Sequence, residues 1–183
     1  MTLNINREFL QHVIRIAKQA GVAIREIYEH PDEVAVITKS DDSPVTAADH
    51  AAHAVIVAQL AQLTPDIPVL SEESDALDFS VRSQWSRYWL VDPLDGTKEF
   101  IQRSGEFTVN IALIDHHQPV LGVVTVPVKN VAYVGAQNVG AFRIEQDHWQ
   151  PIRVRKVAGK NLGIVGSRRH GAERLQPVLE HIE

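Results

Sequence analysis

The sequence of 183 residues contains no cysteine, which excludes disulfide bonds, thiolate metal ligands and a cysteine nucleophile. Long hydrophobic runs are also missing, since the longest apolar stretch, residues 120–128, is too short to cross a bilayer and contains Pro127. The formal net charge is −5 and no run of Lys or Arg occurs, which disfavours binding to a nucleic-acid polymer, because such binding requires a basic surface. What remains is an ordinary globular composition, with 44% hydrophobic and 22% charged residues.

The N-terminal third predicts two helices. Residues 7–28 carry apolar side chains at helical spacing, and Asn6 is placed to cap this helix. A second helix is predicted over residues 46–63, because its apolar pattern stops just before Pro65. The polar segment between them, residues 39–46, is expected to be a loop.

Strands follow from residue 67 onward. Residues 67–73 and 87–92 are predicted strands, and a short helical turn is predicted over residues 97–103. Further strands are predicted in quick succession over residues 107–115, 119–127, 131–136, 140–144 and 149–154. Such close spacing implies an antiparallel meander, and two helices packed against it give an α+β fold. We expect this lobe to span residues 1–158 and residues 159–183 to begin an incomplete second α/β lobe.

Acidic side chains occur at three places that attract attention: Asp49, Glu72 within the sequence SEES, and Asp92 with Asp95. Each place has a purely structural explanation. Asp49 lies three residues after Thr46 and completes a capping box, SEES suits a solvated loop, and the sequence DPLDG favours a turn. Taken one at a time, these structural roles compete with a functional one.

Together, the acidic residues predict a metal site. Glu72 and Asp92 both follow apolar strands, so both carboxylates are expected at the same edge of one sheet. Two like charges about 4 Å apart repel by about 4 kcal/mol at an effective dielectric constant of about 20, which a marginally stable fold tolerates only with a proton or a cation. The available ligands are oxygens, which favours Mg²⁺ over zinc. Asp95 and the carbonyl oxygen of Leu94 are expected to add further ligands.

Gly96 and Thr97 follow this site and open the short predicted helix, whose free N–H groups suit a phosphate. A Thr97 hydroxyl that is hydrogen-bonded to a carboxylate such as Asp49 can orient and deprotonate a water beside the metal. These groups therefore predict the hydrolysis of a phosphate monoester.

Two rival functions stay open. A haloacid-dehalogenase-type phosphatase also places acids after a strand and forms an aspartyl-phosphate, here at Asp92. Against it, Asp92 and Asp95 are three residues apart rather than two, so their side chains are not expected to share a strand face. A non-catalytic module that binds Mg²⁺ or a nucleotide would use the same oxygens.

The sequences SPVTAAD, VLSEES and WLVDPLDGTKEFI, followed by GEFTVNIALI, resemble the inositol monophosphatase superfamily of lithium-sensitive, Mg²⁺-dependent phosphatases. The resemblance covers essentially the whole chain. It is closest to the bacterial branch that removes the 3′-phosphate of adenosine 3′,5′-bisphosphate, giving AMP, in sulfate assimilation. It implies a layered αβαβα fold, a small phosphorylated nucleotide as partner, and a cytoplasmic location, in some relatives at the inner face of the membrane. An inositol-phosphate phosphatase of the same superfamily is the alternative.

The resemblance also implies roles for individual residues. Glu72, Asp92 and the carbonyl oxygen of Leu94 would bind a first Mg²⁺, and Asp92 would bridge to a second ion that Asp95 also holds. The residues implied in catalysis are Asp49, Thr97 and Glu72. Those implied around the substrate are Glu72, Leu94, Asp95, Gly96, Thr97 and His170, and those on a mobile loop near a weaker third Mg²⁺ are Lys39 and Asp41.

One departure from the family pattern matters. The later Trp-Asp motif, whose Asp completes the second metal site, is missing, and Trp149 is followed by Gln150. A later segment with Ser and Lys that holds the nucleotide is missing too. We therefore expect a truncated second lobe, weak Mg²⁺ binding, and reduced or no turnover by this chain.

Overall fold

The computed structural model describes residues 3–30, 36–38, 44–75 and 77–156. The chain divides into two compact units, residues 1–152 and 153–183, and every helix and strand described below belongs to the first. The predicted lobe boundary at residues 158–159 lies outside the described residues and stays a prediction. None of the helices in the described part is long and apolar enough to span a membrane.

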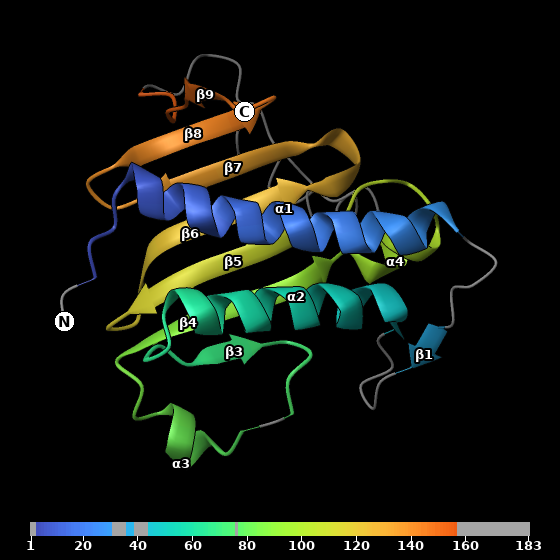
Figure 1. Cartoon of the computed structure of the whole chain (residues 1–183), viewed down its shortest axis with the longest axis horizontal. Helices are drawn as coiled ribbons and strands as arrows, with labels where there is room; N and C mark the ends of the chain where they lie inside the picture. The colour runs from blue at the N-terminus through green and yellow to red at the C-terminus, as the bar shows by residue number, and fades with distance from the viewer. Residues whose placement is uncertain (1–2, 31–35, 39–43, 76, 157–183) are drawn as a thin grey trace, which may run out of the picture. The chain divides into compact units, whose positions relative to one another are not determined.

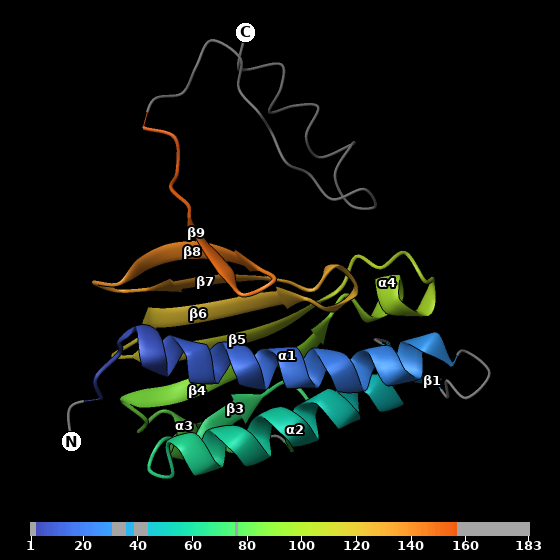
Figure 2. The same cartoon turned by 45° about the horizontal axis from the view of Figure 1, so that its top comes forward.

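Two long helices form one layer of the first unit. Helix α1 (Arg7–Glu29) begins after Asn6, whose Oδ1 accepts a hydrogen bond from the backbone N–H of Phe9 at 2.8 Å. Helix α2 (Ala47–Leu63) begins after Thr46 and ends before Pro65. Both helices and both N-caps are as the sequence predicted. Figures 1 and 2 show the two helices side by side along the same face of the sheet.

The second layer is a seven-stranded sheet with the strand order β3-β4-β5-β6-β7-β8-β9. Its strands are β3 (Val69–Ser71), β4 (Arg87–Asp95), β5 (Thr108–Asp115), β6 (Gln118–Val126), β7 (Val131–Ala136), β8 (Gly140–Glu145) and β9 (His148–Pro151). Strands β4 to β9 form the predicted antiparallel meander, whereas β3 pairs with β4 in parallel. Helices packed on one face of a mostly antiparallel sheet confirm the α+β class.

The smaller elements differ in part from the prediction. Residues 44–46, expected to lie in a loop, form strand β2 (Pro44–Thr46), which pairs with β1 (Val36–Thr38) in a separate two-stranded sheet. Local polar composition cannot reveal such a pairing, because it depends on a partner strand. The predicted helical turn is α4 (Thr97–Ile101), whereas β1, α3 (Phe79–Arg82) and the 3₁₀ turn η2 (Pro127–Lys129) were not predicted.

The sequence DPLDG is not a free turn after the strand. It is the last part of β4, where the register with β5 shifts between Asp92 and Asp95. Asp92 is paired with Asn110 and Asp95 with Thr108, so three steps along β4 lie opposite two steps along β5. Residues two apart on β5 face the same side of the sheet, and the extra residue in β4 brings both aspartates to that side. The prediction that they do not share a strand face was therefore wrong, because it assumed unbroken alternation.

The end of α2 is tied to the centre of the sheet by a buried hydrogen bond. The indole Nε1 of Trp89 in β4 donates to Thr64 Oγ1 at 2.8 Å, and both side chains are buried. The Thr64 hydroxyl in turn donates to the carbonyl oxygen of Leu60 at 3.1 Å. Thr64 is the C-cap of α2, so this short chain of bonds fixes the helix end against the strand that leads to Asp92.

We expect Thr64→Val to lower the free energy of unfolding by about 1–3 kcal/mol, because the indole N–H of Trp89 would stay buried without an acceptor. Thr64→Ser keeps the hydroxyl and is expected to cost less. Urea unfolding followed by Trp fluorescence and by circular dichroism measures both variants. Equal stability of the Val and Ser variants would contradict a role for this hydrogen bond.

Candidate active site

The parallel pairing of β3 with β4 brings two acidic residues to one edge of the sheet. Ser71 is paired with Val91, and the backbone N–H of Glu72 donates to the Val91 carbonyl at 3.0 Å. Both strands run in the same direction, so Glu72 and Asp92, the next residues along each strand, lie next to each other at the same edge. This is the arrangement that the two apolar strands predicted.

Asp92 is the centre of the acidic group. Burial raises the pKa of this carboxyl to about 7, and the charges of Glu72 and Asp95 and a hydrogen bond with Glu72 act in the same direction, against a smaller opposing effect of the Leu94 backbone N–H. The Oδ1 atom of Asp92 is buried and has no hydrogen-bond partner. A buried carboxylate oxygen without a donor, beside two further acids, is costly unless a proton or a cation neutralises it.

Asp95 is held by a residue that the sequence did not single out. The amide Nδ2 of Asn110 donates to Asp95 Oδ2 at 3.0 Å, and the Thr108 hydroxyl donates to Asn110 Oδ1 at 3.1 Å. Thr108 and Asn110 are the polar members of the alternating segment FTVNIALI, and they alternate with buried Phe107, Val109 and Ile111. The only signal that the sequence offered was an amide at a polar position of an alternating strand.

Thr97 and Asp49 make the contact that was expected of them. Thr97 Oγ1 lies 3.1 Å from Asp49 Oδ1 and 3.3 Å from the Leu94 carbonyl oxygen, and it can donate its single hydrogen to either. The other carboxylate oxygen of Asp49 accepts from the backbone N–H of Thr46 at 2.8 Å and from its hydroxyl at 2.7 Å. Asp49 therefore completes the capping box of α2 and also reaches the start of α4, so its structural and functional roles are compatible.

Gly96 is required by its backbone. It is the N-cap of α4 with φ of 96°, a left-handed conformation that side chains rarely tolerate. A Cβ at this position would also lie 3.0 Å from the Glu106 carbonyl oxygen. Its predicted contact with a substrate phosphate stays a prediction.

The acidic group has the right ligand chemistry for a hard cation, although its side chains do not form a complete ligand set. Within the described part of the chain, no three Asp, Glu, His or Cys side chains lie close enough to make a complete ligand set. The buried Asp92 oxygen without a donor nevertheless fits Mg²⁺, since carboxylate and carbonyl oxygens are the ligands that this ion prefers. Three ionised carboxylates at this edge would repel one another, and a bound cation would offset that repulsion.

A second contact missed by the sequence ties α2 to the end of β3. His53 Nδ1 lies 2.8 Å from the hydroxyl of Ser71, the buried residue directly before Glu72. Burial lowers the pKa of His53, with Glu73 acting in the opposite direction. His53 follows Asp49 by one helical turn, so the same side of α2 contacts both strand β3 and the residues that follow strand β4.

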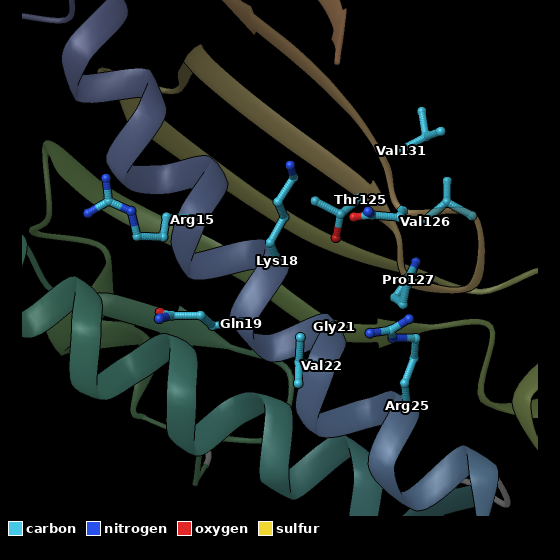
Figure 3. A pocket seen from close by; sticks show the side chains of 11 residues that line it. Arg15, Lys18, Gln19, Gly21, Val22, Arg25, Thr125, Val126, Pro127 and Val131 are labelled. Atoms are coloured by element: carbon cyan, nitrogen blue, oxygen red, sulfur yellow. The ribbon is translucent and has the colours of Figure 1, made fainter. Parts of the chain in front are cut away.

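Other predicted site residues lie outside the described part of the chain: Lys39, Asp41 and His170. A cavity of about 310 Å³ lies between α1 and the end of β6. Figure 3 shows Lys18 and Arg25 on its helix side and Thr125 on its strand side. None of the predicted site residues in the described ranges lines this cavity, so we do not place the substrate there.

The sequence matches the model of the inositol monophosphatase family over residues 5–182. The chain belongs to this family. Among its relatives within the family is a protein named 3′(2′),5′-bisphosphate nucleotidase CysQ from Escherichia coli (strain K12), which is 51% identical over 173 residues, or 94% of this chain and 69% of the relative. A protein of the same name from Buchnera aphidicola is 37% identical over 180 residues, or 98% of this chain and 67% of the relative. The predicted family is confirmed.

Two solved structures show that the fold is shared with known proteins. CysQ from Bacteroides thetaiotaomicron, described as a bacterial member of the inositol monophosphatase family, has 34% sequence identity and a TM-score of 0.75, covering 100% of this chain and 70% of that one. The extragenic suppressor protein suhB from Bartonella henselae has 27% identity and a TM-score of 0.71, covering 81% of this chain and 55% of that one. The chain thus spans about two thirds of the named nucleotidases and about half of suhB.

The raised pKa of Asp92 makes the stability of this family member depend on pH in a definite direction. In metal-free protein, Asp92 stays protonated in the folded state up to about pH 7, whereas in the unfolded chain it ionises near its ordinary pKa of 3.8. Between these values the folded state binds more protons, so stability falls as the pH rises. We expect Asp92→Asn to be more stable than the wild type at pH 8, with a difference that shrinks toward pH 5.

Thermal unfolding in the presence of a chelator measures this dependence. Asp115→Asn is a control of opposite sign, because Arg87, 2.7 Å from Asp115 Oδ2, holds the pKa of that carboxyl below its usual value. That variant should be slightly less stable than the wild type at pH 7 and equal to it at low pH. A difference between Asp92→Asn and the wild type that does not change with pH would contradict the assignment.

Proposed function

We propose that this protein is a Mg²⁺-dependent, lithium-sensitive phosphatase that hydrolyses the 3′-phosphate of adenosine 3′,5′-bisphosphate to AMP and phosphate. The observation that carries the proposal is the environment of Asp92, a buried carboxyl beside Glu72 and Asp95 with one oxygen that has no donor. The 51% identity to the E. coli nucleotidase supports this substrate over an inositol phosphate. A role in sulfate assimilation and a cytoplasmic location belong to the proposal, and association with a membrane surface does not.

The metal ligands in this proposal are the oxygens that meet at the edge of β3 and β4. Glu72, Asp92, Asp95 and the carbonyl oxygen of Leu94 would hold two ions, and a weaker third would lie near Lys39 and Asp41. When bound, Mg²⁺ supplies positive charge that stabilises the negative charge developing on the phosphoryl oxygens. Gly96 and Thr97 would bind the phosphate, and His170 would approach the nucleotide.

Thr97 and Asp49 would prepare the attacking water. When the Thr97 hydroxyl donates to Asp49 Oδ1, its lone pairs are free to accept a hydrogen bond from that water. As the water oxygen forms a bond to phosphorus and the bond from phosphorus to the 3′ oxygen breaks, a proton leaves the water for Thr97 Oγ1. The proton of Thr97 passes in turn to Asp49, and the departing 3′ oxygen takes up a proton from solvent to become the 3′-hydroxyl of AMP. The hydrogen bonds from Thr46 keep the Asp49 carboxylate in place throughout.

The first test is an assay of phosphate release from adenosine 3′,5′-bisphosphate with Mg²⁺, with a chelator, and with added Li⁺. We expect Mg²⁺-dependent turnover that Li⁺ inhibits and that Asp92→Asn abolishes. The E. coli nucleotidase, which is 51% identical to this chain, serves as the positive control.

Each remaining outcome of this assay points to a different function. Faster release from an inositol phosphate would replace the proposed substrate within the same family. Saturable Mg²⁺ or nucleotide binding without any turnover, in a chain shown to be the natural full length, would support a non-catalytic binding module. Trapping of a phosphoenzyme on Asp92 by acid quench would favour an aspartyl-phosphate mechanism and contradict direct attack by water.

The second test concerns Thr97. We expect Thr97→Val to lower kcat by about 10²–10⁴-fold, the usual contribution of a group that assists proton transfer. Thr97→Ser keeps the hydroxyl and is expected to retain most of the activity. Melting temperatures close to that of the wild type for both variants would show that the loss does not come from unfolding, and equal kcat for both would contradict the proposed role of the hydroxyl.

A further inference from the structure

The hydrogen bonds around Asp95 form an ordered chain that runs across two strands. Thr108 and Asn110 lie on the same face of β5, and Thr108 is the direct cross-strand partner of Asp95. The Thr108 hydroxyl donates a hydrogen bond to the amide oxygen of Asn110 at 3.1 Å. The amide nitrogen of Asn110 therefore faces Asp95 and donates to its Oδ2 at 3.0 Å. The Thr108 contact thus decides which end of the amide meets the carboxylate, and only the nitrogen end attracts it.

This chain also decides which oxygen of Asp95 is available. Its Oδ2 is engaged by Asn110, so Oδ1 is the oxygen that this bond leaves for another partner. The side chain of Asp95 is exposed, so without the bond it would be free to sample several rotamers. An exposed carboxylate that is held in one rotamer loses less conformational freedom when it binds a cation.

The register shift in β4 makes the contact possible. Asn110 is the cross-strand partner of Asp92, and it reaches Asp95 diagonally because the extra residue brings Asp95 to the same side of the sheet. A neutral amide beside Asp92 and Asp95 also adds no further negative charge to the acidic group. A carboxylate at this position would increase the repulsion that the site already carries.

We propose that Thr108 and Asn110 are positioning residues that orient Asp95 so that its Oδ1 binds the divalent cation. This inference rests on the proposed metal site but not on the identity of the substrate. In this proposal two residues of β5 are not cation ligands themselves, yet they increase the affinity of the site for the cation by a measurable amount. Outer residues that orient a metal ligand contribute about 10–100-fold to affinity, and an exposed ligand such as Asp95 places the effect near the lower figure.

The experiment measures Mn²⁺ binding to the chelator-treated full chain by electron paramagnetic resonance, since Mn²⁺ prefers the same oxygen ligands and its free form is directly visible. We expect Asn110→Ala and Thr108→Val to weaken binding by about tenfold, and Thr108→Ser to restore it to within about twofold of the wild type. Asn4→Ala, at an exposed position remote from the acids, is the matched control and should bind like the wild type.

A double-mutant cycle separates positioning from general damage to the fold. If Asn110 acts through Asp95, Asn110→Ala should add no loss of Mn²⁺ affinity in the Asp95→Asn background, whereas an unrelated structural effect would add in full. Full additivity, or equal losses for the Val and Ser variants at position 108, would overturn the inference. Unchanged affinity in Asn110→Ala while Asp95→Asn loses binding would overturn it too. A wild-type chain that binds no Mn²⁺ would instead overturn the metal site of the proposed function, and this inference with it.

Discussion

The parallel contact between β3 and β4 is the constraint on which the acidic site depends. A strand of three residues, Val69–Ser71, aligns with the centre of β4, and the bond from the Glu72 N–H to the Val91 carbonyl fixes its end. If β3 slipped by one residue, Glu72 would turn to the other face of the sheet and leave Asp92 without its neighbour. The buried indole of Trp89 holds β4 against the end of α2, so core packing supports a polar site.

Asp49 connects helix stability to chemistry in a single side chain. One of its oxygens closes the capping box of α2 and the other lies within reach of the Thr97 hydroxyl. Its carboxylate is buried, so its hydrogen-bond partners are protein groups that the fold holds in place and not exchanging water molecules. His53, one turn further along α2, contacts Ser71 in the same manner. The helix therefore acts as a rigid support for residues on β3 and on α4.

The sequence predicted the long elements well because their signals are local. The apolar period of α1, the cap at Asn6 and the stop at Pro65 act within a few residues, and so does the alternation of β5 and β6. The register shift at Asp92 and Asp95 was not predictable, because it appears only when β4 is aligned with β5. The acids Glu72 and Asp92 were grouped correctly because each follows a strand that can be recognised locally. Asn110 was missed because its role depends on a diagonal contact across two strands.

The register shift in β4 also bears on how this segment can vary. Deleting either Pro93 or Leu94 would leave two steps along β4 opposite the two steps between Asn110 and Thr108 on β5, so plain alternation would return. The deletion would also remove a buried apolar residue. An insertion that keeps the one-residue register shift would leave three ordinary steps between Asp92 and Asp95 and so turn Asp95 toward the apolar layer. The spacing of two residues between these aspartates is thus matched to the register shift and to two buried residues, so changes of side chain at the aspartates should disturb the local backbone less than changes of length.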